Sequence, residues 1–190
     1  MKFLFFLPGW EGLAADSRVL RDAVTRDGGL RVTRGTYYLC DNGYANAARF
    51  LTPYKNVRYH LKEWGVGAQR PQNARELFNL RHTRARNIME RAFAVLKMRW
   101  NILRSASFYP IKIQIRLIMA CSLLHNFICG EMLNNPLDQH VECATQDLGD
   151  EDGHGDPDFV DQVEPSTEWN QMRDDLANSM WSNQPNVDES

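Results

Sequence analysis

An apolar run that ends in an acidic turn is the strongest constraint on the fold. Residues 37–40, Tyr-Tyr-Leu-Cys, are followed at once by Asp41, Asn42 and Gly43. A short apolar run rich in aromatic side chains predicts a buried strand. Asp-Asn-Gly predicts a turn, and a turn former is the simplest interpretation of Asp41. The alternative is functional, because the acid is expected at the carboxyl end of a strand.

A second acid, Glu90, lies in a long segment that we expect to be helical from about 74 to 103. At helical spacing Thr83, Arg86, Glu90, Ala94 and Lys97 share one stripe. The face expected to be buried holds Ala85, Ile88, Met89, Ala92, Leu96, Trp100 and Leu103. Glu90 could form a plain surface ion pair with Arg86, worth well under about 1 kcal/mol. A strand-end Asp and a helix-borne Glu are also typical ligands of Mg²⁺ in phosphoryl chemistry.

The other elements follow from apolar periodicity and turn residues. In chain order we expect a strand at Lys2–Leu7, a helix from Asp16 to Thr25 capped by Asp16, a strand at Thr36–Cys40, a short helix at Ala45–Leu51, a short strand at Val57–His60, a loop at Trp64–Asn73, and helices at 74–103 and 110–134. Alternation of strands and helices predicts an α/β fold.

The charges divide sharply along the chain. Residues 1–130 hold 21 Lys and Arg against 8 Asp and Glu, whereas residues 131–190 hold 1 against 16. The basic part is typical of a polyanion binder. Residues 135–190 are predicted to form an acidic, largely disordered tail, with a short amphipathic helix near 166–181 behind a Ser166 cap.

Several other classes of protein are disfavoured. No apolar stretch approaches the roughly 20 residues that a membrane helix needs, so no membrane partner is expected. Cys121, His125 and Cys129 are spaced by four residues, but the outer pair would lie about 12 Å apart on a helix, too far for one zinc ion. We therefore interpret His125 as a hydrogen-bonded core histidine.

Five ordered blocks of this sequence resemble the nuclease domain of PIF/Harbinger-type transposases, which includes the Harbinger transposase-derived nucleases. The blocks are GWEGLAADSRVL, YYLCDNGYAN, FLTPYK, ELFNLRHTRARNIMERAFAVLKMRW and ACSLLHNFI. The resemblance implies a ribonuclease-H-like domain over residues 1–134 and an Asp-Asp-Glu triad that holds Mg²⁺ or Mn²⁺. Asp41 matches the second acid and Glu90 the third. Ala94 stands where the family usually has Gly.

The first acid of that triad has no counterpart here, because the chain is expected to begin within the third strand of the family's fold. We do not expect Asp16 to replace it, because its carboxylate is predicted to cap a helix. A complete relative would cut DNA by a two-metal mechanism, with Arg86 and Lys97 stabilising charge. This partial fold, lacking two strands and one acid, is expected to bind metal weakly and not to turn over, so its status as an enzyme is left open.

The resemblance and the charge together indicate DNA as the partner. Basic side chains of the long helix are the expected phosphate contacts: Arg81, Arg84, Arg86, Arg91, Lys97 and Arg99. The family also implies a Myb-like partner protein and a nuclear location, or a cytoplasmic one without that partner. The alternative is a non-catalytic module that binds nucleic acid or protein, in which the acidic tail binds a partner or covers the basic face.

Overall fold

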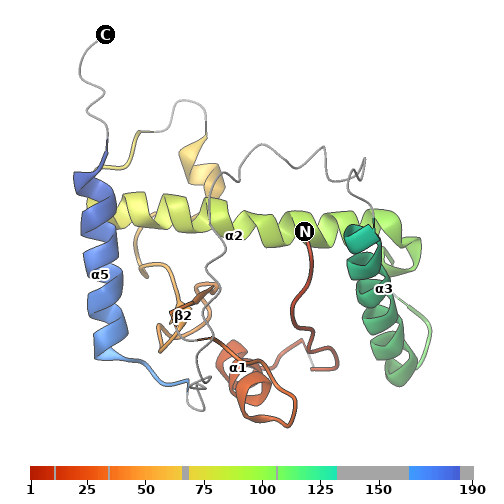
Figure 1. The fold of residues 1–190 in the computed structure, drawn as a ribbon. Coiled ribbons are helices and arrows are strands. Elements are labelled where there is room, and N and C mark those ends of the chain that lie inside the picture. Colours follow the sequence, from red (N-terminus) through yellow and green to blue (C-terminus); the bar gives the residue numbers. More distant parts are fainter. Residues whose placement is uncertain (11, 34, 66–68, 106, 132–162, 185–190) are drawn as a thin grey trace. The chain divides into compact units, whose positions relative to one another are not determined.

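A computed structural model describes residues 1–10, 12–33, 35–65, 69–105, 107–131 and 163–184 (Figure 1). The elements are α1 (Asp16–Thr25), β1 (Tyr38–Leu39), β2 (Phe50–Leu51), the 3-10 helix η1 (Leu61–Trp64), α2 (Ala74–Arg99), the 3-10 helix η2 (Asn101–Leu103), α3 (Ile111–Glu131) and α5 (Thr167–Ser182). This mixed helical fold with a small parallel sheet is consistent with the predicted α/β class.

The described residues form two compact units. The sheet unit comprises residues 15–87 and 163–184, and the helical unit comprises residues 1–14 and 88–131. The boundary falls inside α2, which is continuous from Ala74 to Arg99. Asp41 therefore belongs to the sheet unit and Glu90 to the helical unit.

The sheet consists of two short parallel strands. Tyr38 is in register with Phe50, and Leu39 with Leu51. Residues 45–51 were predicted to be a short helix, and this is wrong, because Phe50–Leu51 is β2. Arg49 has a φ of 65°, a left-handed conformation that does not continue a right-handed helix. Phe50 and Leu51 are each 1% exposed, so both residues of β2 are buried.

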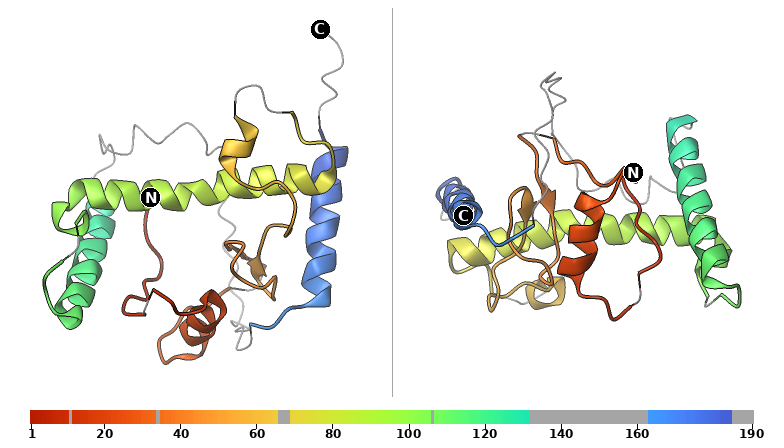
Figure 2. Two further views of the ribbon diagram at one scale, coloured as in Figure 1. Left: turned by 180° about the vertical axis from the view of Figure 1, so that it is seen from behind. Right: turned by 90° about the horizontal axis from the view of Figure 1, so that it is seen from below.

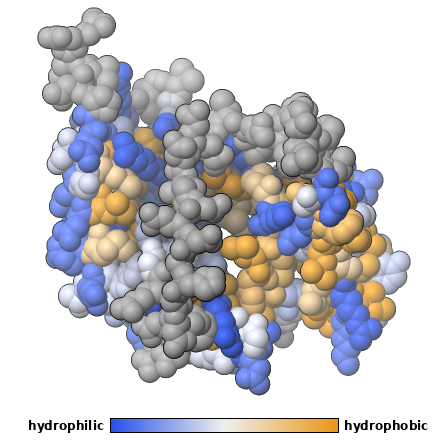
Figure 3. Space-filling view, in the orientation of Figure 1, coloured by the Kyte–Doolittle hydropathy of each residue, from blue (hydrophilic) through white to orange (hydrophobic). Residues whose placement is uncertain are grey.

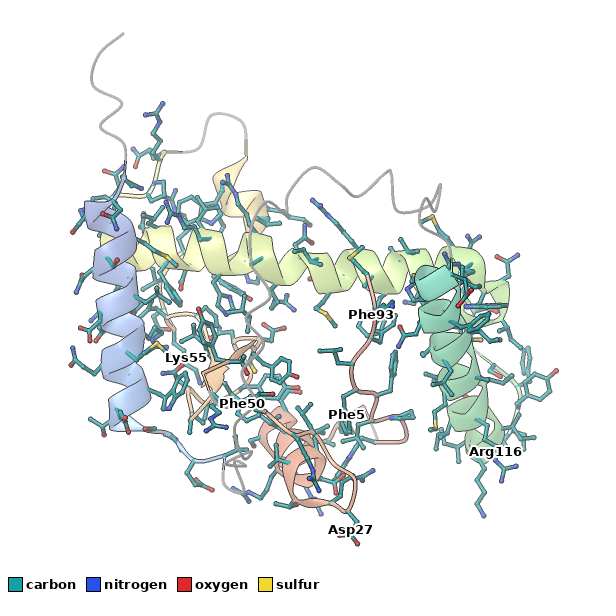
Figure 4. The ribbon with its side chains drawn as sticks, in the orientation of Figure 1. Phe5, Asp27, Phe50, Lys55, Phe93 and Arg116 are labelled. Atoms are coloured by element: carbon teal, nitrogen blue, oxygen red, sulfur yellow. The ribbon has the colours of Figure 1, made fainter. Side chains whose placement is uncertain are left out.

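One core cluster of the sheet unit joins α1 to the sheet. Leu20 of α1 packs with Val32, Ala47, Phe50 and Val163. Figure 4 shows Phe50 on the side of the strand pair that faces α1. The predicted helix from Asp16 to Thr25 is confirmed, and Leu20 and Ala23 are its buried residues. Val163 comes from the far end of the acidic region, so that part of the chain returns to the core.

The segment 54–60 was predicted to contain a strand, and it is irregular before η1. Its backbone is paired instead with the side chain of Asn79, which is 0% exposed on α2. The amide Oδ1 accepts from the Tyr54 N–H at 2.8 Å, and Nδ2 donates to the carbonyls of Tyr54, Val57 and Arg58 at 3.1 to 3.3 Å. One buried amide thus supplies the hydrogen bonds that a neighbouring strand would give.

Helix α5 packs beside the amino-terminal end of α2, as the views in Figures 1 and 2 agree. Ala177 is 1% exposed and packs with Leu51, Tyr54 and Phe78. The Ser166 side chain caps the helix by accepting from the Trp169 N–H, as predicted. Residues 135–162, most of the predicted disordered tail, lie outside the described residues.

Polar contacts hold α5 to the segment that follows β2. The Tyr54 hydroxyl donates to Asp174 at 2.6 Å. Arg173 lies over the Tyr54 ring and donates to the carbonyls of Thr52 and Pro53. Residues 163–184 of the acidic region are therefore part of the folded sheet unit.

In the helical unit, Lys2–Leu7 was predicted to be a strand, but among the described residues it has no strand partner. The Asn126 side chain of α3 takes that place. Its Oδ1 accepts from the Phe3 N–H at 2.8 Å, and its Nδ2 donates to the Phe3 carbonyl at 2.6 Å. Phe3 packs on Ala92 and Leu96, and its ring lies 5.4 Å from that of Phe93, which is labelled in Figure 4.

The predicted helices 74–103 and 110–134 are observed as α2 with η2 and as α3. The expected buried face of α2 is only partly correct. Ala92 and Leu96 are buried, but Ala85 and Met89 are exposed. His82 and Thr83 are buried instead, because each hydrogen-bonds to backbone of the sheet unit.

One described helix, α3, is long and apolar enough to cross a membrane, contrary to the sequence expectation. Length and composition are weak evidence, since a core helix passes the same test. Its buried side chains are Cys121, Ser122 and His125. Figure 3 shows apolar surface over α3, and its exposed large apolar residues are Ile111, Ile113, Met119, Leu123, Leu124 and Phe127.

Replacing Asn79 with Leu should destabilise the sheet unit by more than about 2 kcal/mol, because several buried backbone groups lose their partner at about 1 to 3 kcal/mol each. Urea unfolding of the full chain measures the change. Asn101→Leu, at an exposed asparagine, is the control and should stay within about 0.5 kcal/mol. Equal effects of the two substitutions would contradict the role of the Asn79 amide.

Replacing Ala177 with Glu should lower stability by more than about 2 kcal/mol, because it forces a carboxylate against the apolar side chains beneath α5. Asn178→Glu adds the same charge to the exposed neighbour and should be nearly neutral. Thermal melts followed by circular dichroism compare the two variants. If Ala177→Glu melted like Asn178→Glu, α5 would not be docked in solution.

Candidate functional site

Asp41 lies at the carboxyl end of β1, as the sequence predicted. The strand pairing closes with the Cys40 N–H donating to the Leu51 carbonyl at 2.8 Å. The chain then turns, and the Tyr44 N–H donates to the Asp41 carbonyl at 3.1 Å. The Asn42 N–H donates to Asp41 Oδ1 at 2.6 Å. The turn thus holds the carboxylate directly beyond the strand end, with 48% of the side chain exposed.

Arg86 of α2 pairs with this carboxylate. Its Nη1 lies 3.4 Å from Asp41 Oδ2, and its Nε donates to the Tyr59 hydroxyl at 3.0 Å. The Tyr59 hydroxyl in turn lies 3.5 Å from Asp41 Oδ1. These three side chains form a closed ring of contacts, which we name the Asp41 clamp.

Tyr59 is held firmly in this clamp. Its side chain is buried, and its carbonyl accepts a 2.8 Å hydrogen bond from Thr83 on α2. Burial raises the pKa of the Tyr59 phenol, and the charge of Arg86 opposes the rise. The hydroxyl therefore stays protonated and can donate to Asp41 while accepting from Arg86. Sequence reasoning missed Tyr59, because a tyrosine in a short predicted strand carries no signal of a polar role.

Asp16 lies against the same turn. It was predicted to cap α1, but the cap position is Ala15 and no side chain caps the helix. A Cβ atom added to Gly43 would clash with Asp16 Oδ2, so the carboxylate occupies the space beside that glycine. Burial, and next the charge of Asp16, raise the pKa of the Tyr44 phenol. Asp16 thus adds negative charge beside the Asp41 turn.

Cys40 does not contribute a thiolate to this site. Burial, and next the charge of Asp41, raise the pKa of its thiol to about 12. The thiol is therefore neutral at physiological pH and is a poor nucleophile there.

Glu90 is exposed on α2, four residues after Arg86 and thus one helical turn further along. It belongs to the helical unit, so its proximity to Asp41 stays a prediction. Ala94 and Lys97 are exposed on the same helix.

The predicted phosphate contacts differ in their surroundings. Arg81 and Arg84 are exposed on α2 in the sheet unit, and Arg86 is 22% exposed in the clamp. In the helical unit Lys97 is exposed and Arg91 is half-buried. Arg99 lies 3.1 Å from Nδ1 of His125, so it has a contact inside the protein.

His125 is a core histidine, as predicted. It is 1% exposed, with Nε2 3.0 Å from the Met1 carbonyl and Nδ1 facing Arg99. Within the described part of the chain, no three His, Cys, Asp or Glu side chains are grouped closely enough to hold a metal ion.

The chain was compared with known proteins. It is 27% identical over 165 residues to the protein Antagonist of Like Heterochromatin Protein 1 of Arabidopsis thaliana, an alignment that covers 77% of this chain and 39% of the relative. The chain therefore spans about two fifths of that relative's length. No solved structure matches it. Residues 1–126 match the family described as DDE superfamily endonuclease, and because this is about two thirds of the chain, the protein belongs to that family.

Proposed function

We propose that this protein is a DNA-binding domain derived from a Harbinger-type transposase, in which phosphodiester cleavage is weak or absent. Membership of an endonuclease family supports a DNA partner. The ribonuclease-H-like arrangement of the family belongs to the same proposal, and the small parallel sheet with an acid at its strand end is compatible with it.

The observation that carries the proposal is a pair of exposed arginines on α2, together with an acid that is already paired. Arg81 and Arg84 are three residues apart and both are exposed, so they share one side of the helix. Exposed guanidinium groups suit phosphate contacts that depend on salt and not on base sequence. Asp41 would repel phosphate, but Arg86 offsets its charge.

The contacts within the clamp also bear on whether a divalent cation fits at Asp41. DDE superfamily endonucleases generally use divalent metal ions, and Asp41 and Glu90 are the ligands that we would expect. In the sheet unit, however, both Asp41 oxygens have partners, and a positive guanidinium lies 3.4 Å from one of them. The arrangement therefore does not fit a divalent ion as the side chains lie, and it supports no two-metal step.

A nuclear location belongs to the proposal. The relative's name describes an antagonist of a heterochromatin protein, which supports action on chromatin. A separate Myb-like partner for target recognition is part of the same proposal.

The double substitution Arg81→Gln with Arg84→Gln should weaken binding to duplex DNA at least about fivefold at low salt. It should also reduce the slope of log affinity against log salt by roughly 2, since each lost phosphate contact contributes about 0.9. Fluorescence anisotropy with a labelled duplex in buffer without divalent metal measures both. Lys112→Gln with Arg116→Gln removes two exposed charges from α3 and serves as the control. Equal losses would mean that overall charge, and not the α2 face, drives binding.

Metal-dependent cleavage is the second candidate, favoured by the solvent-exposed acids at Asp41 and Glu90. We expect supercoiled plasmid in Mn²⁺ to be nicked no faster by the full chain than by its Asp41→Asn variant. Agarose gels of the time course measure the rate. Nicking that is present in the native chain and lost in both Asp41→Asn and Glu90→Gln would establish the endonuclease instead.

A further inference from the structure

The carboxylate of Asp41 has partners on both oxygens. Oδ1 accepts from the Asn42 N–H at 2.6 Å and lies 3.5 Å from the Tyr59 hydroxyl. Oδ2 faces Nη1 of Arg86 at 3.4 Å. The positive partner on Oδ2 occupies the side of the carboxylate that would otherwise be available to a cation.

Arg86 is fixed in this position more firmly than an ordinary surface arginine. Its side chain is 22% exposed. Its Nε donates to Tyr59, whose side chain is buried and whose carbonyl is tied to α2 through Thr83. A fixed geometry reduces the entropy that a solvent-exposed pair would lose on forming, which is the usual reason why such pairs contribute little.

We propose that Arg86 is an internal cation that takes the place of a metal ion at Asp41, and that Tyr59 is the residue that positions it. The inference rests on the proposed role of Asp41 as a cation-binding carboxylate. A guanidinium group carries five donors and no acceptor, so it cannot join the ligands of a metal and can only compete with one. A divalent ion therefore reaches Asp41 only when Arg86 leaves.

The clamp also explains why DNA binding should not need a divalent ion in this protein. The guanidinium group already balances the carboxylate charge, which in a metal-dependent enzyme is the task of the ion.

The test follows Mn²⁺ at Asp41 by NMR in the full chain, through paramagnetic broadening of the Asn42 and Gly43 amide signals. In Arg86→Gln, half-broadening should occur at an Mn²⁺ concentration at least about threefold lower than in the native chain, because a positive charge has been removed. Arg86→Lys keeps the charge and should stay near the native value. Tyr59→Phe keeps the ring but releases Arg86, so it should fall between the two.

Two controls locate the effect. Arg84→Gln removes a neighbouring exposed charge that no described contact links to Asp41, and it should not change the Mn²⁺ response. Asp41→Asn combined with Arg86→Gln should abolish the gain. Thermal melts check that each variant is folded. If Arg86→Gln unfolds, Arg86→Lys decides the test, because it keeps the positive charge. An Mn²⁺ response of Arg86→Lys that differs from the native one would then count against the proposal.

The outcomes separate this inference from the proposed function. An equal Mn²⁺ response in the native chain and Arg86→Gln, whether strong or absent, overturns the proposal that Arg86 acts as an internal cation. A gain in Mn²⁺ affinity in Arg84→Gln as large as in Arg86→Gln overturns the proposal as well, because loss of any nearby positive charge would then explain the gain. A native response in Tyr59→Phe overturns the positioning role of Tyr59. DNA binding is measured without Mn²⁺, so a failure of the proposed function appears there and not in this experiment.

Discussion

The pairing of buried backbone groups by asparagine side chains is the interaction on which the described fold depends. Extended segments without a strand neighbour must find hydrogen bonds elsewhere, because an unpaired buried N–H or C=O group is costly. Asn79 provides them for residues 54–58 and Asn126 for Phe3. The Asn46 side chain has a similar role between β2 and α5, since its Oδ1 accepts from the Thr52 N–H and its Nδ2 donates to the Asn170 side chain of α5. Irregular chain can therefore lie against helices without a large sheet.

One face of α2 links the core of the sheet unit to Asp41. Asn79, His82, Thr83 and Arg86 follow one another at helical spacing. They contact, in that order, residues 54–58, Leu51, Tyr59 and Asp41. His82 faces the Leu51 carbonyl at 3.1 Å, and burial lowers the pKa of its imidazole. Because these contacts share a rigid helix, the position of the Asp41 clamp is coupled to the packing of the sheet unit.

The sequence was a good guide to the helices and to the place of Asp41, because apolar periodicity and an Asp-Asn-Gly turn are local signals. It was a poor guide to Lys2–Leu7 and to residues 45–60, since an apolar run indicates burial but not what covers it. The buried face of α2 was partly wrong for the same reason. His82 and Thr83 are polar, and only the backbone that they bind makes their burial favourable. Tyr59 and the position of Asp16 depend on contacts between distant segments, which no local pattern contains.

The thiol beside the acid has a consequence for how the sheet can be observed. Burial and the charge of Asp41 raise the pKa of Cys40 to about 12, so very little thiolate is present at neutral pH. Alkylating reagents attack the thiolate, so the half-buried thiol should react slowly in the folded chain and faster when β1 leaves β2. The modification rate of Cys40 thus reports on the opening of the strand pair, and its measurement needs no label introduced into the protein.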